Sequence, residues 1–174
     1  MRLGALLGRV LMLALPGHAL ACWDEAGSRY GVSPHLLYAI ARVESRLNPQ
    51  AVNLTHRQRT GTYDIGLMQI NSSNLPALAR HGISENDLYN PCTNINVGAW
   101  LLAQTFSRHG VSWDGVGAYN ASCTQLRGLA CQDARSRYAW LVYRQLPAQQ
   151  SPRAQRIAQT ATVRAPILTA RVSP

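Results

Sequence analysis

The sequence predicts a mainly α-helical fold, and three observations support this class. Apolar residues recur at helical spacing in several segments, and two of these segments begin with a capping residue followed by proline. No segment shows the apolar–polar alternation of a half-buried strand. With 174 residues, 47% of them hydrophobic and 14% charged, the chain has the size and composition of one packed domain without internal repeats.

The first 21 residues have the pattern of a secretory signal peptide. Two arginines precede the apolar run Val10–Leu15, which is too short for a stable transmembrane helix. Ala19 and Ala21 place small residues where a signal peptidase reads the chain. We therefore expect cleavage before Cys22, a periplasmic location and no integral membrane segment afterwards. A buried N-terminal helix and a lipid on Cys22 are the alternatives.

Helices are expected through most of the region 22–146. Ser33-Pro34 and Asn90-Pro91 each combine an N-cap with proline at the first helical position. The polar stretch 50–64 is expected to be a loop that could contain a small hairpin. The expected helices cover residues 34–47, 73 to about 82, 91–109, 112–119 and about 133–146.

The composition changes from Pro147 onward. The segment 147–174 is rich in Pro, Ala, Gln and Thr and contains four Arg but no acidic residue. We expect a basic, disordered tail, with a weak helix around 154–160 as the alternative. The predicted organisation is thus a signal peptide (1–21), one domain (22–146) and this tail (147–174).

The chain is strongly basic, with 17 basic and 8 acidic residues, a net charge of +9 and arginine as its only basic residue besides histidine. Basic charge favours polyanions in general, so a nucleic-acid binder is one candidate class. Export, cysteines suited to disulfides and arginines scattered rather than striped argue against it. A cell wall with anionic stem peptides fits the same charge. No metal, nucleotide or haem motif is present, so no cofactor is expected.

Four cysteines remain after the expected cleavage, an even number that favours disulfides in an oxidising compartment. Three pairings are formally open. The short, turn-like stretch between Cys123 and Cys131 favours a bridge there, which leaves Cys22 with Cys92. A four-cysteine zinc site is the competing interpretation, and the absence of CxxC spacing argues against it.

Glu44 is the candidate catalytic residue. It follows Leu37 by seven and Ile40 by four positions, so on a helix it projects from the apolar face near the C-terminus. Apolar neighbours and the negative end of the helix dipole both disfavour the carboxylate and raise its pKa. Such a carboxyl can act as a general acid near neutral pH. A surface glutamate paired with Arg42 or Arg46 is the alternative.

Three motifs in order decide between these interpretations: ESRLNP at 44–49, GLMQIN at 66–71 and AYNAS at 118–122. Their order and spacing resemble the lytic transglycosylase (SLT-type) domain of the goose-type lysozyme superfamily, over about residues 22–146. The segments CWDEAG, YDI and PCTNI resemble a narrower branch, the small exported transglycosylases of conjugative, type IV and type III secretion and pilus systems. The resemblance implies a lysozyme-like domain with short helices around a glycan-binding cleft.

The resemblance also implies residue roles. Glu44 would be the catalytic acid and later the base. For Leu67 a core position is favoured over a contact with the glycan. The residues expected to contact the glycan or shape the cleft are Ser45, Gly66, Leu67, Met68, Gln69, Tyr119 and Asn120. The chain departs from the family pattern at Leu47, where an aromatic residue is usual, and at Ser122, where glycine is usual.

Asp64, which replaces a small residue of the pattern, is a possible second carboxylate. If it faces Glu44, hydrolysis by an activated water is expected, as in two-carboxylate glycosidases. Otherwise the substrate's own N-acetyl group and C6 hydroxyl would take part, which gives a 1,6-anhydro-muramyl end without consuming water. The resemblance favours this second route.

The expected function is therefore that of a peptidoglycan lytic transglycosylase. It would cleave the MurNAc-GlcNAc β-1,4 bond and open the wall locally for a secretion, conjugation or pilus apparatus. Its expected partners are peptidoglycan strands and components of that apparatus. A hydrolytic lysozyme and a non-catalytic, exported glycan-binding adaptor are the alternatives, and the presence of Glu44 argues against the adaptor.

Overall fold

The computed structural model describes residues 17–147, and its fold is mainly helical. Most of the expected signal peptide, residues 1–16, and the tail 148–174 lie outside the described residues. Two short 3₁₀ turns, η1 (Ser72–Asn74) and η2 (Asn86–Tyr89), join the longer elements. The α-helices are α1 (Gly17–Tyr30), α2 (Pro34–Ser45), α3 (Arg57–Thr60), α4 (Leu75–Ala79), α5 (Pro91–His109), α6 (Trp113–Asn120) and α7 (Gly128–Tyr143). The expected fold class is confirmed.

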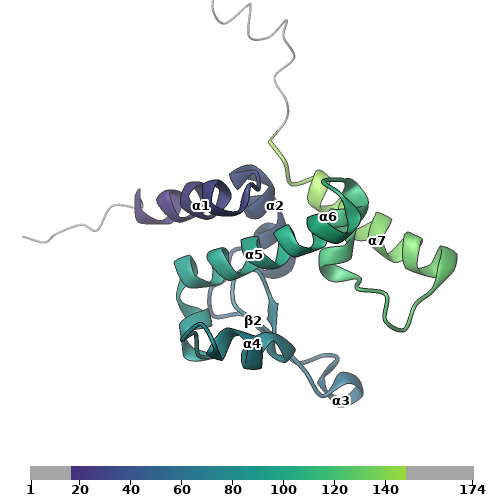
Figure 1. Ribbon diagram of the computed structural model, residues 1–174, viewed down its shortest axis with the longest axis horizontal. Coiled ribbons are helices and arrows are strands. Elements are labelled where there is room, and N and C mark those ends of the chain that lie inside the picture. The colour runs from purple at the N-terminus through teal and green to yellow at the C-terminus, as the bar shows by residue number, and fades with distance from the viewer. Residues whose placement is uncertain (1–16, 148–174) are drawn as a thin grey trace, which may run out of the picture.

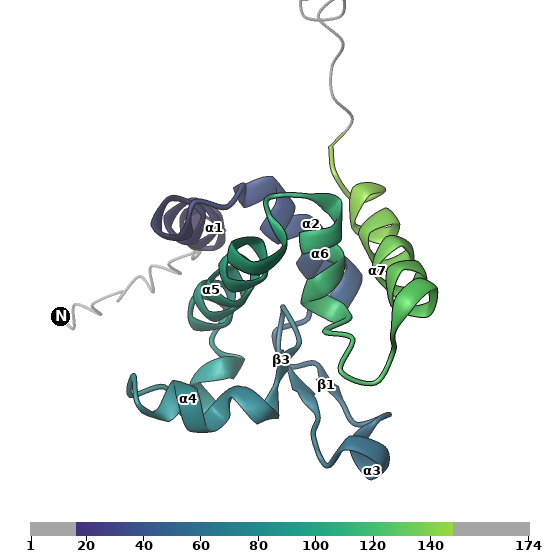
Figure 2. The ribbon, with the colours of Figure 1, turned by 45° about the vertical axis from the view of Figure 1, so that its right-hand side comes forward.

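The long helix α5 runs through the middle of the molecule, with α1 and α2 on one side and a small sheet with α3 and α4 on the other (Figures 1 and 2). Its start follows the predicted signal, because the Asn90 side chain accepts a hydrogen bond from the Thr93 N–H and proline follows the cap. None of the described helices is long and apolar enough to cross a membrane. The expected cut before Cys22 falls inside α1.

Three two-residue strands form an antiparallel sheet in the order β1 (Val52–Asn53), β2 (Asp64–Ile65) and β3 (Ile70–Asn71). β1 and the start of β2 lie in the stretch 50–64 that was expected to be a loop. Their antiparallel pairing is the small hairpin given as an alternative for that stretch. Its register aligns Asn53 with Asp64 and Asp64 with Asn71. These three polar residues therefore form one row across the sheet, which becomes part of the site.

Four expected helices have different bounds in the structure. The first ends at Ser45 instead of 47, and α6 covers 113–120 instead of 112–119. The segment 73–82 is divided into η1 and α4, and the latter ends at Ala79. The last helix begins at Gly128 instead of 133 and ends at Tyr143 instead of 146. No side-chain cap marks this start, and Leu129 in the first turn is 77% exposed, so neither a capping residue nor an apolar periodicity indicates a helix start there.

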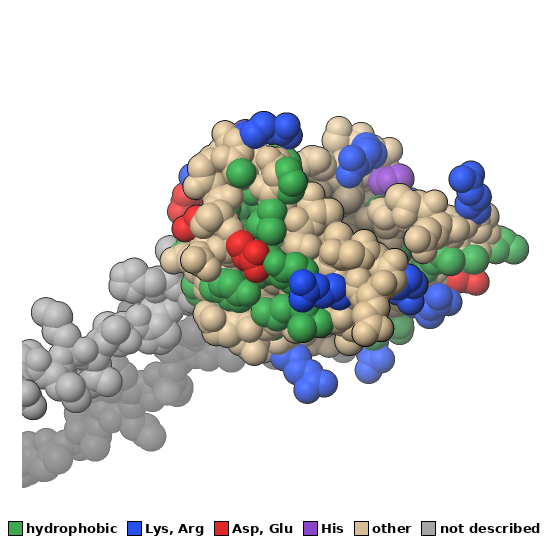
Figure 3. All heavy atoms as spheres, turned by 90° about the horizontal axis from the view of Figure 1, so that it is seen from below, with side chains coloured by type: hydrophobic (Ala, Val, Ile, Leu, Met, Phe, Trp, Pro, Cys, Tyr) green, Lys and Arg blue, Asp and Glu red, His purple; other side chains and the backbone are tan. Residues whose placement is uncertain are grey.

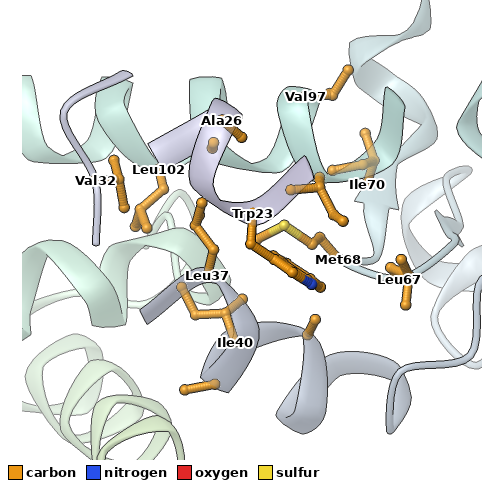
Figure 4. Close-up of a cluster of buried hydrophobic side chains, with 14 of the residues drawn as sticks. Trp23, Ala26, Val32, Leu37, Ile40, Leu67, Met68, Ile70, Val97 and Leu102 are labelled. Atoms are coloured by element: carbon orange, nitrogen blue, oxygen red, sulfur yellow. The ribbon is translucent and has the colours of Figure 1, made fainter. Parts of the chain in front are cut away.

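The core lies where α1, α2, α5 and the segment 66–69 meet. Figure 4 shows Trp23, Leu37, Ile40 and Met68 gathered in this cluster, and all four are buried. At Gly98 of α5 a Cβ atom would collide with the Met68 side chain, so only glycine permits this close approach. This contact determines how closely the segment 66–69 packs against α5.

Candidate active site

Glu44 lies in the last turn of α2, just after the buried residues of that helix. Its side chain is half-buried and forms no ion pair with Arg42 or Arg46 in the part of the chain that the structure describes. Instead the Tyr138 hydroxyl of α7 donates a hydrogen bond of 2.5 Å to Glu44 Oε1. The surface-pair alternative therefore does not describe this carboxyl.

The surroundings raise the pKa of Glu44 from 4.5 to about 7. Burial, which penalises the charged form, is the largest cause. The hydrogen bond from Tyr138 acts in the opposite direction because it stabilises the carboxylate, and the negative charge of Asp64 adds to the rise. A carboxyl with this pKa holds a proton in about half of the molecules at neutral pH, so it can both give and take one.

An open cleft of about 760 Å³ borders Glu44. One part of its lining comes from the sheet and α3, and the other from α5, α6 and the connection between α6 and α7. The lining is mostly polar and uncharged. Besides Glu44, it consists of Asn53, Thr55, His56, Arg59, Thr60, Thr62, Asp64, Gln69, Asn71, Ser73, Asn74, Leu101, Thr105, Arg108, Ala118, Tyr119, Asn120, Ser122 and Thr124.

The turn at Gly66 begins the segment that shapes the cleft next to Glu44. Gly66 has φ +75°, and a Cβ atom there would collide with the Asn94 side chain and lie 2.6 Å from the Leu88 carbonyl oxygen. Only glycine combines this backbone conformation with this close approach. The turn explains the glycine of the second motif without any contact to substrate.

Buried Asn94 of α5 holds this segment in place. Its Nδ2 donates to the carbonyl oxygens of Ile65 (3.0 Å) and Leu88 (2.8 Å), and its Oδ1 accepts from the Met68 N–H (2.8 Å). From the other side, the Tyr119 hydroxyl donates to the Met68 carbonyl oxygen (2.9 Å). The backbone of the GLMQ motif is thus fixed by side chains from two helices.

Ser45 performs a similar task from α2. Its hydroxyl donates to the Leu67 carbonyl oxygen at 2.7 Å and accepts from the Asn48 N–H at 3.1 Å. It thereby connects the helix that carries Glu44 to the second motif and to the turn that follows α2. Because the hydroxyl is engaged within the protein, Ser45 positions the site from behind the cleft wall.

The predicted binding residues therefore separate into two groups. Gln69, Tyr119 and Asn120 line the cleft together with Glu44. Four others are not among the residues that line the cleft, and their contact with the glycan stays a prediction. These are Ser45, Gly66, Leu67 and Met68, of which the last two have their side chains buried in the core. They support the wall of the cleft from behind. For Leu67 this is the core position that was the alternative to a glycan contact.

Gln69 has a backbone conformation that few residues other than glycine adopt, with φ +48°. Its side-chain amide nitrogen, Nε2, donates to the carbonyl oxygens of Gly66 (2.9 Å) and Ala51 (3.3 Å). Within the described residues its Oε1 accepts no hydrogen bond. The amide is therefore oriented by the protein and leaves one acceptor for a ligand in the cleft.

Asp64 also lines the cleft, but its two oxygens are engaged. Oδ1 accepts from Asn71 Nδ2 at 2.7 Å, and Oδ2 accepts from Asn53 Nδ2 at 3.2 Å. His56 Nδ1 lies 3.7 Å from Oδ2. These partners are the row that the sheet register creates, so Asp64 braces the sheet at the cleft while its charge acts on Glu44.

Sequence reasoning missed Tyr138 and Asn94 as site residues. Tyr138 lies on the buried face of the last helix, and a buried tyrosine hydroxyl normally requires a partner. Asn94 precedes Gly98 by four positions on the buried face of α5, where a polar side chain signals a specific hydrogen-bonding role. Both residues are recognisable in the sequence as buried polar side chains. Their hydrogen-bond partners are not, because these lie far away along the chain.

Both expected disulfides, Cys22–Cys92 and Cys123–Cys131, are present. The first joins α1 to the first turn of α5, and the second closes the connection between α6 and α7 beside the cleft. The zinc alternative fails because all four sulfurs are in bridges, and the described residues contain no other cluster suited to a metal ion.

A comparison with protein families matches residues 21–137 to the model of the Transglycosylase SLT domain. The chain belongs to this family. The chain is 42% identical over 129 residues to the "Invasion protein IagB" of Salmonella typhimurium, covering 72% of this chain and 76% of that protein. It is 39% identical over 124 residues to "Protein IpgF" of Shigella flexneri, covering 71% and 77%. It is 37% identical over 139 residues to a "Peptidoglycan-binding-like protein" of Escherichia coli O157:H7, covering 77% and 81%.

Proposed function

We propose that the protein is a peptidoglycan lytic transglycosylase that cleaves the MurNAc-GlcNAc β-1,4 bond and leaves 1,6-anhydro-MurNAc ends. The single observation that carries this proposal is Glu44, a half-buried carboxyl with a pKa of about 7 at an open, polar cleft. Membership of the SLT family supports the reaction class.

The proposed reaction uses Glu44 twice. In the first step protonated Glu44 gives its proton to the glycosidic oxygen, the C1–O bond breaks, and the N-acetyl oxygen of the same MurNAc stabilises C1. In the second step the C6 hydroxyl oxygen bonds to C1 while ionised Glu44 takes the hydroxyl proton. The site ends in its starting protonation state, so a pKa near the working pH suits both steps.

The engagement of Asp64 supports this route over hydrolysis. A second catalytic carboxylate must turn an oxygen lone pair toward the sugar or toward a water. The asparagine side chains of the neighbouring strands donate to both oxygens of Asp64 and hold its carboxylate toward the sheet, which favours the route that uses Glu44 alone. The role of Asp64 in the proposal is to raise the pKa of Glu44 and to brace the sheet.

We further propose that the enzyme works in the periplasm and opens the wall for a larger apparatus. Two disulfides fit an oxidising compartment. One relative is named an invasion protein and another is described as peptidoglycan-binding-like, which supports a wall-directed role beside such an apparatus. Cleavage of residues 1–21 and the role of the basic tail 147–174 are parts of this proposal.

The proposal is tested by mass analysis of the muropeptides that the purified protein releases from peptidoglycan. Fragments with 1,6-anhydro-MurNAc ends are expected from the wild type and none from Glu44→Gln. Fragments with reducing ends would show a lysozyme instead, and binding without any release would show a glycan-binding adaptor.

A further inference from the structure

Two arginines are found among the described residues that line the cleft. They are Arg59 of α3 and Arg108 in the last turn of α5. Both side chains are exposed, and within the described residues neither forms a hydrogen bond or an ion pair. Other arginines of the chain are engaged, for example Arg135 with Asp114 at 2.9 Å. The two guanidinium groups at the cleft thus keep all their donors for a ligand.

Their charge does not serve the catalytic carboxyl. The causes that set the pKa of Glu44 are burial, Tyr138 and Asp64, and neither arginine is among them. Neither guanidinium group donates a hydrogen bond to Glu44 or to Asp64 among the contacts of the described residues. The negative charge of Asp64 has His56 and two asparagine amides as its neighbours. The cleft therefore offers two positive charges that neither carboxyl uses.

We propose that Arg59 and Arg108 bind the carboxylates of the stem peptide, so that the cleft selects peptide-bearing, anionic glycan over neutral glycan. This inference rests on the proposed function and names the substrate class of the same site. The stem peptide leaves the glycan at the lactyl group of MurNAc, so its carboxylates lie away from the bond that Glu44 attacks. Arginine presents a planar fork of donors that matches a carboxylate.

The polar lining between the arginines fits such a substrate. Threonine and asparagine side chains offer donors and acceptors for peptide amides and sugar hydroxyl groups alike. Arginine side chains are also spread around the face of the molecule that Figure 3 shows, where acidic side chains are fewer. This wider charge attracts any polyanion, so the selectivity is assigned to the two arginines at the cleft and not to the net charge.

The test measures binding to the full chain carrying Glu44→Gln, which avoids turnover. One ligand is a soluble peptidoglycan strand with its stem peptides, and the other is the same strand after its peptide carboxylates have been converted to amides. We expect tighter binding of the anionic strand. Arg59→Gln and Arg108→Gln should each weaken that binding about 2–5-fold, the range of one exposed charge pair, with little effect on the amidated strand. The preference should shrink as salt is raised.

Arg80→Gln is the matched control, because Arg80 is exposed and lies outside the cleft lining. It should leave the preference unchanged. Arg59→Glu with Arg108→Glu should abolish or reverse the preference while the folded state is retained. If the double glutamine variant keeps the full preference, or weakens both ligands equally, the inference is wrong.

Wild-type cleavage of the two strands separates this inference from the proposed function. Cleavage of both strands at equal efficiency would overturn the inference and leave the transglycosylase proposal intact. Selective binding of the anionic strand without cleavage of either would overturn the transglycosylase proposal and support the role of the arginines.

Discussion

The helical side of the cleft and its sheet side differ in how their residues are packed. Glu44 and Tyr119 project from helices whose other faces are buried, and Tyr138 contacts Glu44 from a third helix. On the sheet side α3 has no buried residue, and Val52 and Leu54 are 43% and 52% exposed. The polar side chains there are ordered by hydrogen bonds across the sheet instead.

This difference explains why the two carboxyls of one cleft have different tasks. Burial among helices removes water from Glu44 and raises its pKa, which is the condition for proton transfer. The sheet gives Asp64 hydrogen-bond donors for both of its oxygens, which holds its side chain against the neighbouring strands. In the proposed function the packed side therefore supplies the proton-transfer group, and polar side chains from both sides of the cleft contact the substrate.

The largest effect is expected for Glu44→Gln on the helical side. Glutamine has the size of glutamate but has no proton to give, and general acid catalysis is commonly worth about 10²–10⁴-fold. Since one carboxyl serves both steps, the rate of release from peptidoglycan should fall by at least the upper end of this range. A loss below about tenfold would contradict the assignment.

The same variant has a predicted effect on stability that serves as its folding control. Glu44 has a pKa of 4.5 as its ordinary value and about 7 in the fold, so between these pH values the folded state binds more protons than the unfolded state. The free energy of unfolding of the wild type should therefore fall as pH rises from about 4.5 to 7. Glutamine does not titrate, so Glu44→Gln should be more stable than the wild type at pH 8, by on the order of 3 kcal/mol.

Asn94→Ala should damage the helical side through its support of the second motif. The change leaves the Met68 N–H and the Ile65 and Leu88 carbonyl oxygens without their partner. A loss of about 3 kcal/mol in the free energy of unfolding is expected, measured with urea. Asn96→Ala is the control, since that side chain donates only to the Cys92 carbonyl oxygen of its own helix. Equal losses for both variants would show that the described contacts of Asn94 have no special weight.

A smaller effect is expected for Tyr138→Phe. Its hydroxyl lowers the pKa of Glu44 by stabilising the carboxylate, so its removal should raise that pKa further above 7. Because the first step needs protonated Glu44, the fall of kcat/KM at high pH should move to higher pH. Tyr143→Phe, an exposed tyrosine of the same helix, should leave the profile unchanged. A move to lower pH would contradict the hydrogen bond's assigned effect.

The smallest effect is expected for deletion of residues 148–174. The cleft residues found within the described range 17–147 supply Glu44 and its polar surroundings without this segment. Release of muropeptides should therefore remain largely intact, while association with the wall or a partner weakens because four arginines are lost. Loss of the folded domain, measured by circular dichroism, would show that the tail packs on it.

The sequence allowed the helices to be predicted where a local signal exists. Asn90-Pro91 predicted the start of α5, because helix capping depends only on residues that are neighbours in the sequence. The start of α7 at Gly128 has no side-chain cap, and two-residue strands are too short to show alternation. These elements are determined by contacts between distant segments, which a local pattern does not contain.

The candidate site was predictable to a similar degree. The position of Glu44 on an apolar helix face followed from spacing, but its partner Tyr138 lies 94 residues further along the chain. Whether Asp64 is free or engaged depends on the register that places Asn53 and Asn71 beside it. Side chains such as Met68 could belong to the core or to the cleft, and only packing decides between them.

The central claim is that Glu44 is the only carboxyl that takes part in the reaction, while Asp64 stabilises the sheet through its hydrogen bonds. It is tested most directly by digesting purified peptidoglycan in ¹⁸O-labelled water with the wild type and with Asp64→Asn. We predict anhydro ends without solvent oxygen from both proteins, and substantial activity in Asp64→Asn. Reducing ends that contain ¹⁸O, together with an Asp64→Asn variant as inactive as Glu44→Gln, would contradict the account and show a two-carboxylate lysozyme.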